Sequence, residues 1–209
     1  MPYRTQYIAL TDPAWPPTPT RMNGIYAMVA RAIHAPNHTH KNALLNVVTT
    51  ELIAFDGGCA AILATQATFD TWHCGAIAKI TAIPFTWTDA AGGHHGTLSF
   101  GAAQKILNLG LKDWWAIAPN GINQNTQVDR LHGPLDQIVY AFTSRFVGAI
   151  PSLHGPAGAI KSYVTYLTPT DYHIYQNHLN IVAGHLSAGL HLPRAPYRIE
   201  IEQLLWGWI

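Results

Sequence analysis

Residues 102–115, AAQKILNLGLKDWW, lie in the middle of the chain and carry its clearest structural pattern. Its apolar residues recur at helical spacing among polar ones, which predicts an amphipathic helix. They are Ile106, Leu107, Leu109, Leu111 and Trp115. The same periodicity predicts further helices over residues 23–33 and 41–55, one or two within 59–80, and others over 135–147, 172–186 and 197–209. Strand patterns are scarce, so the sequence predicts an all-α fold.

Local signals mark where the predicted helices begin and end. Residues 88–96 are rich in turn formers and predict a connector without regular structure. Pro134 suits the first turn of the predicted helix over residues 135–147, and Thr168 is placed to cap the predicted helix over residues 172–186. The proline-rich residues 1–20 predict an extended arm. We therefore expect a single α-helical domain over residues 1–209 that begins with this arm.

Composition restricts the class of protein. The chain has 209 residues, 48% of them hydrophobic, which is enough for a sizeable core. No apolar run of about 18 residues lacks polar interruption, and the N-terminal residues carry no secretory pattern, so we expect a cytoplasmic protein. A net charge of +1 argues against nucleic-acid binding through bulk charge. Two cysteines outside a Cys-x-x-Cys pattern predict buried thiols rather than a disulfide framework.

Two segments carry a pattern that can perform chemistry. In the first, a turn at Gly101 precedes the helix that holds Lys105, and such a helix N-terminus offers backbone N–H groups to a phosphate. Lys105 and Lys112 share one face of that helix. The second segment, HGPLDQIV at residues 132–139, places Asp136 at the start of the next helix. A lysine and a carboxylate that converge suit chemistry at a sugar carbon.

These segments resemble those of the helix-hairpin-helix DNA glycosylases. LSFGAAQKILN at residues 98–108 is similar to the Gly-x-x-Lys-x-x-Asn/Asp run of the endonuclease III type, and Pro134-Leu135-Asp136 is similar to the segment that opens the next helix there. The archaeal 8-oxoguanine glycosylases carry Thr-Leu-x-Phe, Lys-Ile-Leu-Asn and Asp-x-Leu-Leu-Trp runs, which TLSF, KILN and EQLLW resemble here. The resemblance covers residues 95–140, the hairpin-helix catalytic segment, and residues 197–208. It departs from the family in having one hairpin glycine where two are usual.

The resemblance implies a glycosylase-like fold and a monomeric enzyme that needs no cofactor. Its substrate would be double-stranded DNA with a damaged or modified base, in base-excision repair or in defence against phage with modified DNA. The catalytic pair would be Asp136 and Lys105. The residues expected to contact DNA are Phe100, Gly101, Ala103, Gln104, Lys112 and His132. Those expected to line a pocket for the flipped base are Trp72, Trp115, Tyr175 and Gln176.

Two mechanisms remain open for such a site. Asp136 can stabilise the oxocarbenium-like sugar or activate a water, which leaves an abasic site. Lys105 can instead attack the anomeric carbon and form a Schiff base, which leads to strand cleavage. Two other functions also fit the sequence: a nonenzymatic DNA-binding or defence protein that keeps the fold, and a structural subunit of a virion or filament.

Histidine is abundant, with 12 residues, but its spacing contains no metal signature. Histidines cluster at residues 34–40 and recur at His73-Cys74 and at residues 94–95. None of these groups has the spacing of a zinc site. The sequence therefore predicts no metal site.

Overall fold

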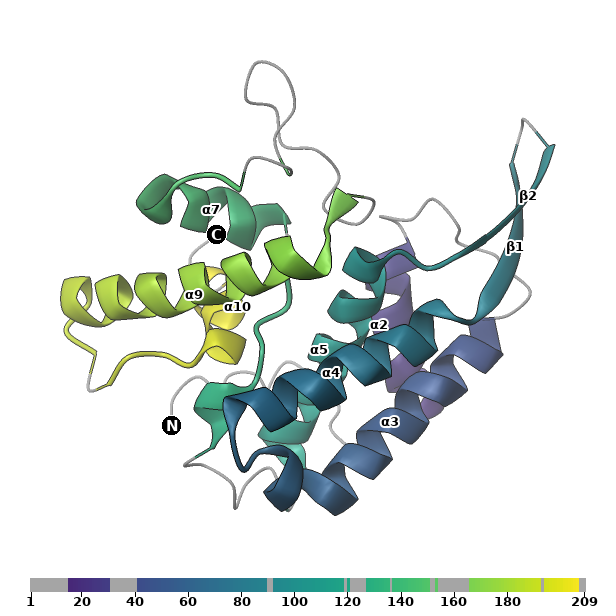
Figure 1. The fold of residues 1–209 in the computed structure, drawn as a ribbon, viewed down its shortest axis with the longest axis horizontal. Helices are drawn as coiled ribbons and strands as arrows, with labels where there is room; N and C mark the ends of the chain where they lie inside the picture. The colour runs from purple at the N-terminus through teal and green to yellow at the C-terminus, as the bar shows by residue number, and fades with distance from the viewer. Residues whose placement is uncertain are drawn as a thin grey trace.

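The computed structural model describes residues 15–30, 41–89, 92–118, 120, 127–135, 137–150, 153, 166–192 and 194–206. Its helices are α2 (Pro19–Ala30), α3 (Lys41–Ile62), α4 (Gln66–Thr81), α5 (Phe100–Ile117), the 3-10 turn η1 (Val128–Arg130), α7 (Gln137–Val147), α9 (Pro169–Gly189) and α10 (Arg198–Trp206). Within these residues the only strands are β1 (Pro84–Asp89) and β2 (Gly92–Thr97). The prediction of an all-α fold is confirmed. Figure 1 shows two groups of helices with the two-stranded ribbon extending from one of them.

Helix α5 is the interior element of the fold. Every residue from Gly101 to Ala116 is buried, and α2, α3 and α4 all pack against it. Gly110 permits the close approach of α3, because a Cβ at this position would lie 2.4 Å from Cδ1 of Leu52. The helix starts where Ser99 Oγ accepts a hydrogen bond from the Ala102 N–H, at 3.3 Å. The sequence correctly predicted this helix, but the helix is enclosed on all sides rather than half exposed.

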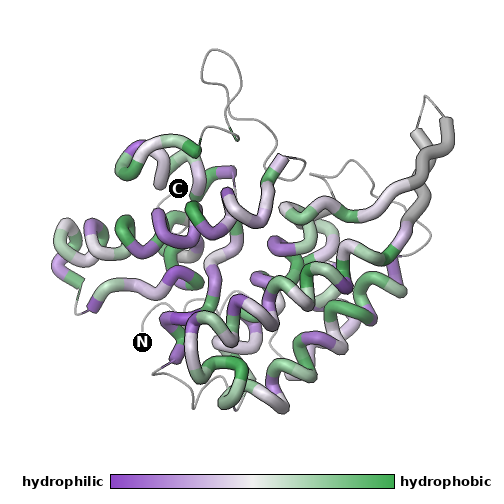
Figure 2. Tube along the Cα trace, in the orientation of Figure 1, coloured by the Kyte–Doolittle hydropathy of each residue, from purple (hydrophilic) through white to green (hydrophobic). Residues whose placement is uncertain are grey.

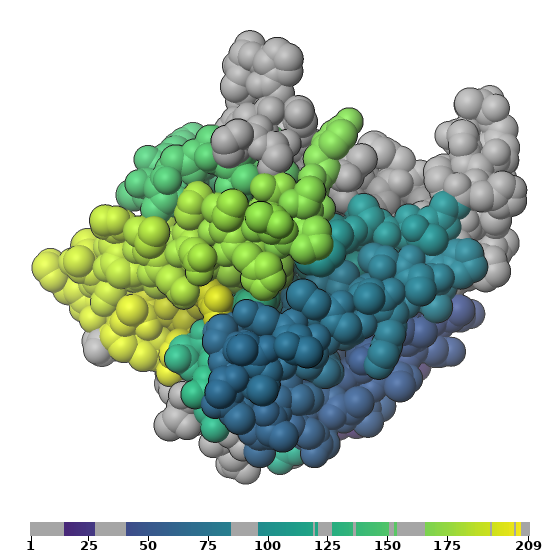
Figure 3. Space-filling view, viewed as in Figure 1, coloured from purple at the N-terminus to yellow at the C-terminus, as the bar shows by residue number. Residues whose placement is uncertain are grey.

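Helices α7, α9 and α10 form the second group and pack on one another. The cap predicted for α9 is confirmed, since Thr168 Oγ1 accepts a hydrogen bond from the Asp171 N–H at 3.2 Å and Pro169 follows it. Polar and apolar residues are interleaved along the helices of both groups (Figure 2), as expected for helices that bury one face. On the face shown in Figure 3, α4 lies next to the start of α9. Beneath this surface the buried rings of His73 and Tyr172 stack on each other.

The ribbon corrects the expectation of an irregular connector at residues 88–96. Its strands pair from Pro84 with Thr97 to Asp89 with Gly92. The first strand, PFTWTD, consists mostly of aromatic and β-branched residues, which favour extended backbone. A strand signal was therefore present in the sequence, but the segment is too short to be distinguished from the helical pattern around it.

Other boundaries also differ from the predictions. Helix α3 continues through Gly57 and Gly58 to Ile62, so the predicted break at this point is absent. The next helix begins only after Thr65, which forms a reciprocal capping box with Thr68. Helix α2 begins inside the predicted arm, and residues 1–14 of that arm lie outside the described part of the chain.

Helix α3 has the length and apolar composition of a membrane-spanning helix. Its apolar side chains include a buried face that packs in the core. The buried residues of this face are Leu44, Leu45, Val48, Leu52, Phe55 and Cys59. About a third of the most apolar window of α3 is buried in the core, and one helix of this kind is weak evidence about a membrane.

Candidate functional site

The glycine turn predicted to precede the helix and bind a phosphate is itself part of helix α5. Gly101 lies in the first turn of α5 and is buried, as is Ala103. Phe100, the first residue of α5, is half-buried. A phosphate cannot reach backbone that is enclosed by other helices, so the prediction that Gly101 and Ala103 contact DNA is wrong.

Gln104 and Lys112 are likewise directed into the protein. Lys112 Nζ forms an ion pair of 3.0 Å with Glu202 on α10, and both side chains are buried. The Gln104 side chain accepts a hydrogen bond from the Leu135 N–H at 3.2 Å and donates one to the Leu135 carbonyl at 3.4 Å. Neither side chain faces solvent, so the structure does not present them to DNA as the sequence predicted. The cause is the enclosure of α5, whose polar residues have their partners inside the fold.

The predicted catalytic pair lies on two segments that the structure brings together. Lys105 is buried, with 8% of its surface exposed. Asp136 itself lies outside the described residues. The residue before each of them is described, and these two residues, Gln104 and Leu135, are joined by the hydrogen bonds above. The two segments of the resemblance are thus in contact, although they are far apart in the sequence.

The residues predicted to line a base pocket separate into two groups. Trp115, Tyr175 and Gln176 are buried. The Tyr175 hydroxyl donates to the Pro134 carbonyl at 3.3 Å, and Gln176 hydrogen-bonds both backbone groups of Gly133, at 2.8 and 2.9 Å. These three side chains therefore belong to the core and to the support of the loop before α7, and their role in lining a base pocket stays a prediction.

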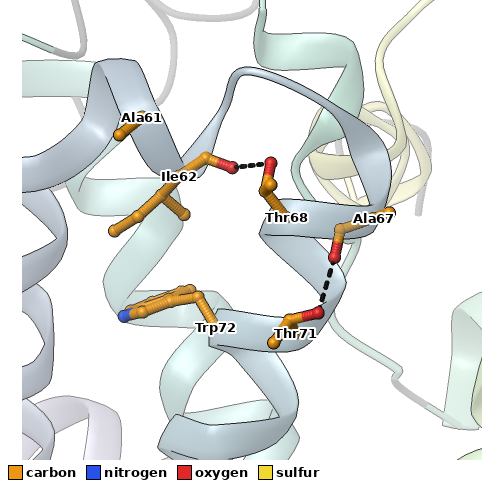
Figure 4. Close-up of a pocket in the computed structure, with 6 residues that line it drawn as sticks. All are labelled: Ala61, Ile62, Ala67, Thr68, Thr71 and Trp72. Carbon is orange, nitrogen blue, oxygen red and sulfur yellow. Dashed lines mark hydrogen bonds between the residues drawn. The ribbon is translucent and has the colours of Figure 1, made fainter.

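Trp72 is the exception among these aromatic residues. It is half-buried, and Figure 4 shows it beside a shallow apolar depression where α3 turns into α4. The depression is lined by Ala61, Ile62, Ala67, Thr68, Thr71 and Trp72. The indole packs on the ring of Phe55, with centroids 4.6 Å apart. Trp72 can therefore offer part of an apolar surface to a ligand.

A buried polar network occupies the space between α4, α5 and α9. Asn108 Oδ1 lies 2.8 Å from His73 Nε2, and Asn108 Nδ2 donates to the Tyr172 hydroxyl at 2.6 Å. The amide nitrogen of Asn108 also donates to Gln104 Oε1 at 3.0 Å. An acceptor at Asn108 Oδ1 requires the proton of His73 on Nε2. Burial holds the pKa of His73 well below its usual value, so this imidazole is neutral at pH 7.

Next to this network lie a buried histidine, His132, and a partly exposed carboxylate, Asp70. His132, which the sequence assigned to DNA contact, is 1% exposed and lies on the loop before α7. Its Nε2 is 3.0 Å from Asp70 Oδ1 on α4. Gln66 Nε2 donates to the same oxygen at 2.8 Å, and Arg198 on α10 donates to Gln66 Oε1 at 2.8 Å. The prediction that His132 contacts DNA is therefore wrong, because its ring is inside this network.

The electrostatics of the histidine and the carboxylate follow from burial. Burial lowers the pKa of His132 to about 4, although the hydrogen bond to Asp70 acts in the opposite direction. Burial by itself would raise the pKa of Asp70, but hydrogen bonds from His132 and Gln66 hold it at about 2. At pH 7 the close contact is thus a hydrogen bond from a neutral imidazole to an anionic carboxylate rather than an ion pair between two charges.

One carboxylate and two imidazoles come within reach of a common ligand in this region. They belong to Asp70, His132 and His173, whose possible ligand atoms all lie within 4.8 Å of one another. The rings of His132 and His173 meet edge to face, with centroids 6.0 Å apart. Asp70 and His173 are partly exposed, and His132 forms the inner end of the cluster.

Sequence reasoning did not identify most of this network. It assigned no function to Asp70, His173 or Arg198, and it named neither Tyr172 nor Asn108 among the site residues. One available signal was that Asp70 and His73 are three residues apart on a predicted helix and so share a face. The remaining partners come from distant segments, and no local spacing relates them.

The comparisons with known proteins add no relative. The chain matches no family model, and neither a curated protein nor a solved structure is similar to it.

Proposed function

We propose that the chain is a DNA glycosylase that hydrolyses the N-glycosidic bond of a damaged or modified base. The observation that carries this proposal is the pair of hydrogen bonds between the Gln104 side chain and the Leu135 backbone. Because Gln104 precedes Lys105 and Leu135 precedes Asp136, the two segments of the resemblance adjoin each other as a shared site would require.

The proposed chemistry places the charge of Asp136 beside the sugar. As the bond from C1′ to the base nitrogen breaks, the sugar becomes oxocarbenium-like, and an anionic carboxylate stabilises it. The same carboxylate takes a proton from the attacking water, whose oxygen adds to C1′. The base leaves with the electron pair of the broken bond and is protonated. The product is an abasic strand.

We assign Lys105 a positioning role in this reaction. Its side chain is buried on α5, the most enclosed helix of the fold. A lysine in this place is better suited to fix a neighbouring group than to meet a sugar carbon that arrives from solvent. Water is therefore the proposed nucleophile, and strand cleavage is not expected to accompany base removal.

The DNA-facing surface must differ from the one expected from the sequence. Of the residues assigned to DNA or to the base, Phe100 and Trp72 keep partial exposure. Aromatic rings of this kind stack on bases or form the wall of a base pocket. We place the flipped base against such a ring, with Asp136 reaching the sugar.

The test incubates the purified full-length chain with duplexes that each carry one modified or damaged base. We expect at least one duplex to break after alkali treatment and to stay intact without it. Borohydride added during turnover should trap no protein–DNA adduct, because no Schiff base forms. An adduct that disappears in Lys105→Gln would instead make this lysine the nucleophile.

Two results would contradict the glycosylase proposal itself. Binding of these duplexes without any release of base would favour a nonenzymatic DNA-binding or defence protein. Absence of both binding and release would favour a structural subunit.

A further inference from the structure

Three side chains from separate parts of the chain converge near the surface between the two groups of helices. Asp70 lies on α4, His132 on the loop before α7, and His173 on the first turns of α9. We propose that Asp70, His132 and His173 form a binding site for a divalent transition-metal ion such as Zn²⁺. This site uses neither residue of the proposed catalytic pair and goes beyond the glycosylase proposal.

The distances within the cluster suit a metal ion. Donor atoms around a tetrahedral zinc ion lie about 3.4 Å apart, given zinc–ligand bonds of about 2.0 to 2.2 Å. Here His132 Nε2 and Asp70 Oδ1 are 3.0 Å apart, and no pair of ligand atoms in the trio is separated by more than 4.8 Å. Side-chain rotations alone can close the remaining difference. Two imidazoles and one carboxylate are a donor set for zinc and for other first-row metals, and they leave coordination positions for water.

The surroundings provide both support and access. His132 is fixed inside the protein, whereas the Asp70 side chain is 29% exposed, so an ion can enter from solvent. Gln66 holds Asp70 through a hydrogen bond of 2.8 Å, the kind of contact that orients a ligating carboxylate.

Two buried ring nitrogens beside the cluster have no hydrogen-bond partner. Among the described residues, Nδ1 of His132 and Nδ1 of His73 are buried and have no hydrogen-bond partner. Their two rings are in contact, with centroids 4.8 Å apart. Buried polar atoms are normally paired, and leaving them unpaired is unfavourable. A water molecule would supply a partner to such an atom, whereas an ion held by Nε2 of His132 lies at another edge of that ring and leaves its Nδ1 unchanged.

The positive charge of Arg198 limits the affinity. Its guanidinium donates to Gln66 Oε1, at 2.8 Å, and to the carbonyls of Asp129 and Arg130, both at 2.9 Å. Gln66 thus lies between Arg198 and Asp70. The single negative charge of Asp70 would be shared between the Arg198 guanidinium and the ion. We therefore expect the ion to bind reversibly and a chelator to remove it.

The experiment measures metal binding by the full-length chain after chelator treatment and dialysis. Zn²⁺ is titrated calorimetrically, and Co²⁺ is added separately because its visible absorption reports nitrogen and oxygen ligands directly. His173→Gln removes one ligand at a partly exposed position, where the fold should survive. His185→Gln is the matched control, since it makes the same change at an exposed position of the same helix.

We expect the wild type and His185→Gln to bind one Zn²⁺ that His173→Gln binds at least 10-fold more weakly. The Co²⁺ spectrum should be equally reduced in His173→Gln, and Asp70→Asn should behave in the same way if it folds. Equal binding by the wild type and both histidine variants would overturn the proposal, as would a wild type that binds neither ion. In either case the cluster would be a hydrogen-bonded network without a metal. Because Asp136 is not part of this site, Asp136→Asn should bind Zn²⁺ normally, which separates this outcome from that of the glycosylase assay.

Discussion

Gly133 shows how closely the loop before α7 is fitted to its neighbours. A Cβ at this residue would lie 2.6 Å from the backbone oxygen of Arg198 and 2.6 Å from Cδ1 of Leu179. Gln176 hydrogen-bonds both the N–H and the carbonyl of Gly133. Only glycine therefore lets α9 and α10 close on this loop, which carries His132 on one side and leads to Asp136 on the other.

Gly133→Ala should lower the free energy of unfolding by about 2 to 4 kcal/mol, because backbone cannot move aside as a flexible side chain can. Urea denaturation monitored by circular dichroism measures the change. Gly184→Ala is the control: it lies within α9 with no atom inside 4 Å of the added Cβ, and it should gain about 0.5 to 1 kcal/mol from helix propensity. Equal effects of the two substitutions would show that the loop is not held as described.

The burial of His132 makes stability depend on pH. The pKa of this imidazole falls from 6.5 to about 4 on folding, so the unfolded chain binds its proton first. Stability should therefore decrease as the pH falls from about 6.5 to about 4, by up to about 3 kcal/mol from this group. His73 acts in the same direction, since burial also lowers its pKa. Asp70, with its pKa at about 2, contributes stability that is lost only below about pH 4.

Urea denaturation at several pH values, in EDTA to exclude metal, tests this dependence. His132→Asn should flatten the decrease between pH 6.5 and 4, whereas the exposed His185→Gln should follow the wild type. A wild type whose stability is constant over this range would contradict the buried, neutral state of His132.

At the scale of elements, α5 and α10 are joined by a buried ion pair. Lys112 and Glu202 are 3.0 Å apart and both nearly inaccessible. Removing one charge of such a pair leaves the other desolvated, so Glu202→Gln should lower the free energy of unfolding by about 3 kcal/mol. The double variant Lys112→Met with Glu202→Leu should lose less than the sum of the single changes.

The pair between α4 and α3 is the natural comparison. Lys79 Nζ lies 2.8 Å from Glu51, but the lysine side chain is 63% exposed. Lys79→Ala should therefore change the free energy of unfolding by less than about 1 kcal/mol. All of these variants are compared in the same urea assay. A cost at Lys79 as large as that at Glu202 would mean that burial does not determine the strength of these contacts.

Helix α5 also shows where sequence reasoning at this scale succeeds and fails. Its apolar spacing was sufficient to predict the helix, because periodicity depends only on local sequence. Its polar residues Gln104 and Lys112 were expected to contact DNA. They are instead paired with Leu135 and Glu202, partners that no local pattern can indicate.

At the scale of the whole molecule, the fold class was predictable and the site was not. Helices can be predicted from the spacing of apolar residues and from capping residues, as the cap at Thr168 illustrates. The polar network depends on how the loop before α7 fits between α4 and α9, which is a tertiary property. Asp70, His132 and His173 are therefore recognisable as a group only after folding.

The central claim is that the segments of Lys105 and Asp136 form the active site of a glycosylase. Its most direct test is single-turnover base release by the wild type and by Asp136→Asn, on the duplex that the screen identifies. This near-isosteric change removes only the charge, so the variant should fold and bind DNA as the wild type does while releasing base about 10² to 10⁴ times more slowly. A folded Asp136→Asn protein that releases base at the wild-type rate would contradict the account.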